Sequence, residues 1–416
     1  MRKKLAILFS IISVLFLSIP AFASEGEKGK IDVKGNIFHH LGDGYGWEVP
    51  FSHTYRIPLP VIVRAEDGSW HCFSSARLSK YEEETDAEGK THTVAVPQIV
   101  SISKGDWKDR YMFVLAHTSK HKDKVVQLIP TSPADEAEAE QTAKAQNDEI
   151  VDGYVKFDGR YYKEYKPFDI SITKNVLALF IAAALVTWMV MGLVRFYSRN
   201  GFKAPRKGMG FLELLVDFIY SGVIKSTLGA KAPKFAPYLL TAFFFILVMN
   251  LLGLIVIFPG GANLTGNIAI TLVLAVMTFV VTNVNGNKHY WKEIFWPDVP
   301  LFLKFPLPIM QVIEIFGMFT KPAALCVRLF ANMMGGHMIV LTLTLLIFIF
   351  AVYGAAVAGI STVMSLLFSI FMLLLDVLVS FIQAYVFTLL STIFISMAVE
   401  EHAEHGAHAK TSEDIA

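Results

Sequence analysis

Cysteine and charge are both scarce in this chain of 416 residues. The two cysteines, Cys72 and Cys326, lie far apart in the sequence, which argues against a disulfide framework or a thiolate metal site. Charged residues make up 18%, below the roughly 25% of ordinary globular domains, whereas hydrophobic residues make up 54%. The formal net charge of +1 lacks the basic excess of nucleic-acid-binding proteins. These shortages favour a membrane protein with no nucleic acid partner.

The first 23 residues have the features of a cleavable signal peptide. A basic start precedes the apolar run Leu5–Ile19, and the small residues of Ala21-Phe22-Ala23 flank a cut site. The alternative is an uncleaved membrane anchor, for which the apolar run is short. We therefore expect residues 1–23 to be removed and the new N-terminus to lie outside the cytoplasmic membrane.

Residues 24–167 are polar, and we expect them to form a small β-rich extracytoplasmic domain. Short alternating or β-branched runs at Tyr55–Arg64, Thr93–Ile102 and Met112–Ala116 are bounded by turn signals. The proline-containing, acidic stretch 130–147 is typical of a linker. The histidines and the cysteine of this region lack zinc-ligand spacing, which favours surface or core positions over a metal site: His39, His40, His53, His71, His92, His117, His121 and Cys72. The sequence does not indicate what this domain does.

Residues 168–400 predict an all-α polytopic membrane domain with about five membrane segments. Asn175–Val194 is an uncharged run long enough to cross a hydrocarbon core of roughly 30 Å, and the basic residues after it favour the cytoplasmic side. Phe211–Leu228 mixes charged and apolar residues, as interfacial amphipathic helices do. Ala236–Phe258 and Ile268–Val284 predict two further spans. Residues 401–416 are then a cytoplasmic tail.

The last two apolar stretches, Pro308–Val352 and Ser361–Val399, are too long for upright spans. Each would measure on the order of 60 Å as a helix, about twice the hydrocarbon core. Residues Gly354–Gly359 supply a turn between them. We therefore expect a strongly tilted helical hairpin that packs against other protein.

Few ionisable side chains interrupt this hairpin, and they carry the functional argument. Apart from cysteine and tyrosine, they are Glu314, Lys321, Arg328, His337 and Asp376. A charge at membrane depth costs several kcal/mol, so such residues usually pair with one another or line water-filled paths.

Helical geometry predicts how these residues are arranged. His337 is nine residues beyond Arg328, which places it on the opposite face and about 13 Å further along the helix. On the second helix, Gln383 and Asp376 are seven residues apart, on one face and about 10 Å apart. If Arg328 and Gln383 are level, the imidazole and the carboxylate lie at nearly the same level. Glu314 lies on the other side of Arg328.

This arrangement is suited to moving protons. The guanidinium of Arg328 stays charged at any accessible pH, so it repels cations and favours the anion of a facing carboxylic acid. His337 and Asp376 titrate and can carry protons toward that centre from outside, while Glu314 can serve the inner side. An arginine barrier between two offset half-channels requires a moving proton carrier, and this chain has no such carboxylate of its own.

The hairpin sequence resembles a known family. Arg328-Leu-Phe-Ala-Asn332-Met-Met-Gly-Gly-His337 follows Lys321-Pro322, and Ser380-Phe-Ile-Gln383 lies on the return stretch. Together with Met249-Asn250-Leu-Leu-Gly-Leu254, these motifs resemble subunit a of the rotary F-type ATP synthase, over about Phe211–His402.

The resemblance implies a role for each of these residues. Arg328 is the essential arginine that faces the ring of proton-carrying c subunits. Asn332, His337, Asp376 and Gln383 line the outer half-channel, and Glu314 lies near the inner one. The chain is then a stator subunit of the bacterial inner membrane that couples proton flow to ATP synthesis. Its partners are the c-ring, the b-subunit peripheral stalk, other synthase subunits and lipid. It has no catalytic residue, metal or cofactor, because ATP is made in other subunits.

Two features depart from the family pattern. Many bacterial relatives carry Glu at the position of His337 and His at the position of Asp376, whereas this chain has the exchanged pair, as mitochondrial relatives do. The signal peptide and the large outer domain have no role in the common pattern.

Other functions and roles remain open from the sequence. A secondary ion-coupled transporter would show internal repeats, which we do not find. A membrane-anchored binding or assembly module would have spans free of functional charge. Asn332 and Gln383 are also residues that hydrogen-bond between membrane helices. The sequence does not decide between H⁺ and Na⁺ as the coupling ion.

Overall fold

The computed structural model describes the chain in two compact units, one up to Ala178 and one from Leu179 onward. The expected signal peptide, most of the expected linker and the expected C-terminal tail lie outside the described residues. The described residues are 42–48, 56–85, 91–103, 110–116, 121, 123–131, 153–157, 160–201, 203, 205, 208–255, 263–295, 309–351 and 355–399.

The first unit is built from antiparallel strands. Its described strands are β1 (Gly46–Glu48), β2 (Arg56–Pro58), β3 (Pro60–Arg64), β4 (Trp70–Ser74), β5 (Ser79–Thr85), β6 (Thr91–Pro97), β7 (Val100–Ser103), β8 (Arg110–Leu115), β9 (Val125–Pro130), β10 (Tyr154–Phe157), β11 (Arg160–Tyr165) and β12 (Phe168–Asp169). They form a five-stranded sheet in the order β10-β11-β9-β8-β7, a three-stranded sheet β12-β3-β4, and the pairs β1-β2 and β5-β6. The predicted β-rich fold of this region is confirmed.

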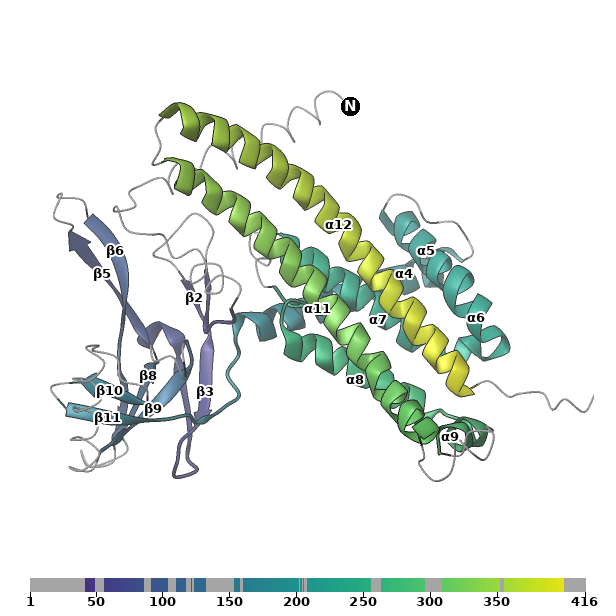
Figure 1. Ribbon diagram of the computed structural model, residues 1–416, viewed down its shortest axis with the longest axis horizontal. Coiled ribbons are helices and arrows are strands. Elements are labelled where there is room, and N and C mark those ends of the chain that lie inside the picture. The colour runs from purple at the N-terminus through teal and green to yellow at the C-terminus, as the bar shows by residue number, and fades with distance from the viewer. Residues whose placement is uncertain are drawn as a thin grey trace, which may run out of the picture. The chain divides into compact units, whose positions relative to one another are not determined.

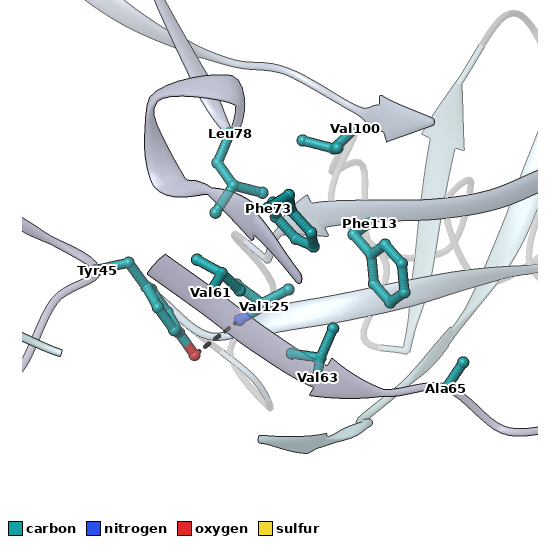
Figure 2. Packing of buried hydrophobic residues seen from close by; sticks show 9 residues of the cluster. All are labelled: Tyr45, Val61, Val63, Ala65, Phe73, Leu78, Val100, Phe113 and Val125. Carbon is teal, nitrogen blue, oxygen red and sulfur yellow. Dashed lines mark hydrogen bonds between the residues drawn. The ribbon is translucent and has the colours of Figure 1, made fainter. Parts of the chain in front are cut away.

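The core of this unit joins the two larger sheets (Figure 2). Burial alternates along β3 and β4, so Val61, Val63 and Phe73 point inward from the three-stranded sheet. They pack against Phe113 and Val125 of the five-stranded sheet. Alternation with period two is what a strand with one buried face requires. The opposite face of β3 and β4 is therefore left exposed.

Two of the predicted strand runs are divided in the structure. Tyr55–Arg64 contains β2, which pairs with β1, and β3, which pairs with β4, so the chain changes sheets at Leu59. Thr93–Ile102 is broken after Pro97, whose missing N–H disfavours a continuous ladder. Hydrophobic alternation predicted the extended backbone but not the change of partner strand.

The second unit is helical (Figure 1). It contains α4 (Lys174–Asn200, which begins in the first unit), α5 (Gly208–Ile219), a π-helical turn (Tyr220–Lys225), α6 (Ser226–Leu228), a 3₁₀ turn (Gly229–Lys231), α7 (Ala232–Leu254), α8 (Ile268–Val284), α9 (Lys288–Phe295), α11 (Ile309–Ala351) and α12 (Ala355–Val399). In the described residues, four helical stretches are long and apolar enough to cross a membrane, or five if α8 and α9, bent by 106°, count as one span. The predicted polytopic α-helical domain with a long terminal hairpin is confirmed.

The helices pack around α7 and the hairpin. In Figure 1, α11 and α12 run side by side; α12 also contacts α7, and α11 contacts α8. On α8 the buried residues Thr271, Ala275, Thr278 and Thr282 recur at helical spacing, while Val273 and Val276 are exposed. Small polar residues let the helices approach, as in the 3.4 Å contact of Thr271 Oγ1 with Cys326 Sγ.

The C-terminal end of α12 is hydrogen-bonded by two other segments. Lys231 Nζ donates to the carbonyl oxygen of Val399 at 2.8 Å, and Asn287 Nδ2 donates to the same oxygen at 2.7 Å. The backbone N–H of Asn287 donates to the carbonyl of Ala398 at 2.9 Å. The last carbonyls of a helix have no partner within it, so these bonds satisfy them.

Two of the predicted boundaries differ from the structure. The first span was expected to end at Val194, but α4 continues to Asn200, because the charge of Arg195 ends the apolar run without ending the helix. The start predicted for the last helix, Ser361, is wrong: Ala355–Gly359, assigned to the turn, already belong to α12. Alanine has the highest helix propensity, and one glycine does not outweigh it. Residues 211–228 are helical in part through a π-turn, and their interfacial position stays a prediction.

Candidate functional site

Arg328 lies on an exposed side of the hairpin. Arg328 and Asn332 are both exposed on α11, and their neighbour Val327 has 57% of its surface exposed. Leu325, one turn before Arg328, and Leu329, the next residue, are buried. Within the described part of the chain, no ion pair joins Arg328 to an acidic side chain. The α11 face therefore presents a guanidinium among apolar side chains, where it can meet a group from outside the chain.

Asp376 of α12 lies directly against the backbone of α11 at Gly336. A Cβ atom placed on Gly336 would be 2.6 Å from Asp376 Oδ1 and 3.1 Å from its Cγ. No carbon approaches a carboxylate oxygen that closely, so the absence of a side chain at Gly336 makes room for the carboxylate. Residue 337, the predicted imidazole, is the next residue along α11. The structure thus brings Asp376 to the level of the Gly336–His337 segment.

His337 has a buried nitrogen. Its Nε2 is buried and has no hydrogen-bond partner among the described residues, although the residue as a whole is half-buried. A buried polar atom without a partner costs roughly 1–3 kcal/mol, so such atoms usually mark a site that uses them or a bound water. The imidazole can accept or donate a proton at that atom.

Gln383 and Asp376 lie on either side of a polar contact between α12 and α7. Gln383 is buried, with 8% exposure. Asn250 of α7 is fully buried, and its Nδ2 donates to the Ser380 carbonyl oxygen at 3.3 Å. Ser380 Oγ in turn donates to the carbonyl oxygen of Asp376 at 2.7 Å. Asn250 Oδ1 is buried with no partner among the described residues, so this contact leaves an acceptor available.

Glu314 and Lys321 occupy the first half of α11. Glu314 is half-buried, and Lys321 Nζ lies 5.7 Å from the ring centroid of Phe394 on α12. Lys321 also lines a cavity of about 20 Å³, room for roughly one water molecule, together with Thr282 and Tyr290. The structure places Glu314 outside the lining of that cavity. It therefore does not bring Glu314 and Lys321 into one site.

The sequence does not predict the part that two residues of this region play. The contact of Gly336 with Asp376 was not predicted, although the adjacent Gly335-Gly336 pair marks a place where another group can approach a helix. The sequence marks Asn250 only as part of a motif, so neither its hydrogen bond to α12 nor its unpaired oxygen was expected. The contact at Gly336 and the hydrogen bond of Asn250 both depend on how α12 packs against its neighbours. The residue periodicity of a single helix does not reveal that packing.

The fold and these residues define a class: a multi-pass membrane protein whose terminal helical hairpin carries an exposed arginine and, on the other helix, a half-buried carboxylate packed against the first. Residues 176–396 match the family model described as "ATP synthase A chain". The chain belongs to this family, and it is a bacterial-type subunit of the membrane sector of an F-type ATP synthase.

Individual relatives agree with the family model. "ATP synthase subunit a" of Chlorobium phaeobacteroides is 43% identical over 251 residues, which cover 58% of this chain and 70% of the relative. "ATP synthase subunit a 2" of Chlorobaculum tepidum is 45% identical over 249 residues, covering 59% and 68%. "ATP synthase subunit a" of Chloroherpeton thalassium is 42% identical over 248 residues, covering 58% and 70%. Residues 36–153 match a second model, "Domain of unknown function (DUF8433)".

Proposed function

We propose that this chain is the proton-translocating stator subunit of its ATP synthase, with two offset half-channels that meet at Arg328. The observation that carries the proposal is the exposed guanidinium of Arg328 on an otherwise apolar face of α11. A charge in that position costs several kcal/mol in lipid, so the face needs a partner that compensates it. The c-subunit ring, with its proton-carrying carboxylates, is that partner.

Arg328 acts as a barrier and as a proton-releasing group. Its positive charge repels protons that would pass straight from one half-channel to the other. It also lowers the free energy of the ring carboxylate anion that faces it, so each arriving carboxylic acid releases its proton. The carboxylate that remains must then move with the ring before it can be protonated again. This requirement couples proton flow to rotation.

The outer half-channel passes between α11 and α12. His337 and Asp376 are the titratable pair, and Gln383 and Asn332 lead from them toward Arg328. Gly336 supports this assignment. Its missing side chain makes room for the Asp376 carboxylate, and Gly336 directly precedes the residue that carries the imidazole. The exchange of acid and imidazole between the two helices keeps one of each, so conduction is retained. Glu314 serves the inner half-channel.

The chain itself does not make ATP. Its partners are the c-ring, the b-subunit peripheral stalk and the other synthase subunits, and it contains no catalytic residue or cofactor of its own. We place it in the bacterial inner membrane, with the signal peptide of residues 1–23 cleaved, the β-rich domain of residues 24–167 outside, and the tail of residues 401–416 in the cytoplasm. Residues 168–400 are the proton-channel domain.

The test is ATP-driven proton pumping in inverted membrane vesicles, in sodium-free buffer and normalised to the amount of assembled complex. Arg328→Ala should reduce pumping to the background level. Arg199→Ala is the matched control, because it removes the same exposed charge at the end of α4 without touching the hairpin. Coupled pumping retained by Arg328→Ala would refute the proposal.

A second variant tests the half-channel separately from the barrier. Asp376→Asn keeps the shape of the side chain but cannot carry a proton as a carboxylate does. Proton flux through the assembled complex should fall, while ATP hydrolysis by detergent-released catalytic subunits stays unchanged. A flux equal to that of the unmodified chain would remove Asp376 from the pathway.

A further inference from the structure

The β-rich unit has an exposed apolar surface on its three-stranded sheet. Because Val61, Val63 and Phe73 point into the core, the alternate residues of the same strands point outward. Trp70 is 53% exposed, Phe168 is 64% exposed and Ile170 is 53% exposed. We call the set of outward residues the outer sheet face; it consists of Ile62, Arg64, Trp70, Cys72, Phe168 and Ile170.

The residues of the outer sheet face contact one another in rows across the strands. Phe168, Arg64 and Trp70 are paired in register across β12, β3 and β4. The Trp70 and Phe168 rings meet edge to face with centroids 6.4 Å apart, and Arg64 Cζ lies 6.0 Å from the Trp70 centroid. Arg64 Nε donates to the Gly68 carbonyl oxygen at 3.1 Å, which holds the guanidinium beside the indole. The face is thus an ordered patch rather than scattered exposed side chains.

This patch is connected to the first membrane span by a short hydrogen-bonded segment. The N–H groups of Ile170 and Ile172 donate to Ile62 and Pro60 and continue the sheet to within two residues of α4. The first turn of α4 is held by the same unit, since Lys174 N–H donates to the Gly44 carbonyl oxygen at 2.9 Å. Ile170 and Lys174 are four residues apart, so at most about 14 Å of chain separates them. The patch therefore lies close to the first turn of α4, a helix long and apolar enough to cross a membrane.

The composition of the patch fits lipid. Tryptophan is enriched at the boundary between hydrocarbon and headgroups, where its ring is partly apolar and partly polar. A guanidinium binds phosphate oxygens in a bidentate manner. Exposed patches of large apolar side chains mark interaction surfaces, and this one is continuous with a membrane span.

We propose that the outer sheet face lies against the phospholipid headgroup layer around the entry point of α4. Trp70, Phe168 and Ile170 contact the upper acyl chains, and Arg64 binds lipid phosphate. This interaction gives the β-rich domain a fixed position on the membrane surface, which is separate from proton transfer. Only the choice of leaflet depends on the orientation proposed above; the lipid contact itself does not.

Cys72 gives a native position for the test. It is exposed on the outer sheet face, opposite Ile62 in the register of β3 and β4, whereas Cys326 is buried. In a Cys326→Ala background, a spin label on Cys72 is measured in the assembled complex, in vesicles of phosphatidylethanolamine and phosphatidylglycerol. Its accessibility to oxygen, which concentrates in lipid, is compared with its accessibility to a water-soluble nickel chelate.

The matched control is a label at Lys163→Cys in a Cys72→Ala, Cys326→Ala background. Lys163 is exposed on β11 of the same unit but belongs to the other sheet. The label at Cys72 should show a higher ratio of oxygen to nickel accessibility than the control label. Adding Trp70→Ser and Phe168→Ser should shift the Cys72 label toward the control value. Circular dichroism should stay unchanged, since neither side chain is in the core.

Two results would overturn the proposal. Equal nickel accessibility at both positions would mean that the outer sheet face is in water. Protection of the Cys72 label from both reagents would mean that another protein covers it. Because pumping is not the readout, either result leaves the assignment of Arg328 untouched, and a failure of pumping leaves the lipid contact untouched.

Discussion

The contact between Gly336 and Asp376 makes a sharp prediction about proton flux. In the Gly336→Ala variant, the new Cβ would lie 2.6 Å from Asp376 Oδ1, and an ordinary contact begins at 3.4 Å, so the carboxylate must move by about 0.8 Å. Inserting a methyl group into a packed contact costs typically about 1–3 kcal/mol. Replacing a helical glycine by alanine returns about 1 kcal/mol of helix propensity. The complex should therefore still assemble, with the carboxylate displaced.

The expected consequence is a loss of flux that exceeds the loss of assembly. A misplacement of about 1 Å at a reacting group can cost on the order of 100-fold in rate. We expect passive proton flux per assembled complex to fall by at least about tenfold, on the same grounds. The assay is acidification of the lumen of proteoliposomes under an imposed potential, with assembly measured by immunoblot of the purified complex.

The control for this prediction is Gly359→Ala on α12. A Cβ at Gly359 meets nothing within 4 Å, so this variant makes the same chemical change without the contact. Gly335 is a less suitable control although its surroundings are also open, because it is seven residues from Arg328 and shares its face. Gly359→Ala should assemble and conduct as the unmodified chain does.

A double variant separates displacement of the carboxylate from general damage to α11. In an Asp376→Ala background, the oxygen that the new Cβ would meet is absent, so Gly336→Ala should add no further loss of assembly or flux. Undiminished flux in the single variant Gly336→Ala, or additive losses in the double variant, would refute the reasoning.

Three further predictions concern stability. Burial and the hydrogen bond to Asp169 raise the pKa of Tyr45. The stability that the neutral hydroxyl contributes is therefore complete below the ordinary pKa of 10.0 and declines at higher pH. Tyr45→Phe should flatten that alkaline decline, measured by urea unfolding of the full chain. The hydrogen bond from the Tyr111 hydroxyl lowers the pKa of Asp67 to about 2. The stability that the Asp67 carboxylate contributes is therefore present above the ordinary pKa of 3.8 and is lost as the pH falls toward 2. Asp67→Asn should remove this acid dependence of stability, and an unchanged acid profile would contradict the prediction. Asn287→Ala removes a hydrogen bond to the end of α12, so it should lower the free energy of unfolding by about 1 kcal/mol, seen as a lower melting temperature of the detergent-solubilised chain. Asn285→Ala removes only a bond within its own helix end and should have a smaller effect.

The membrane fold could be predicted from the sequence because lipid imposes a strong constraint on chain composition. Ile268–Val284 was predicted with the bounds that α8 has, since asparagines flank its apolar run on both sides. The length of the last two stretches similarly required a hairpin. The start of α12 was not predictable in this way, because alanine and glycine between two apolar runs suit either a turn or a helix.

The candidate site was predictable in its residue types but not in its contacts. Scarcity of charge singles out Arg328 and Asp376, because each unpaired charge in a membrane segment needs a reason. Which backbone the carboxylate touches depends on how α12 is shifted along α11, and small differences in packing decide that shift. The contact with Gly336 therefore appears only in the folded structure.

The hydrogen bonds that begin α4 have a consequence for how the chain is made. Its first backbone donors, on Lys174 and Asn175, find their acceptors on Gly44 and Asp43, which are synthesised about 130 residues earlier. Until that earlier segment has folded, the leading turn of α4 lacks these acceptors for its donors. Folding of the β-rich unit and completion of the first turn of α4 are therefore coupled steps. A β-rich unit that fails to fold would leave the start of α4 frayed.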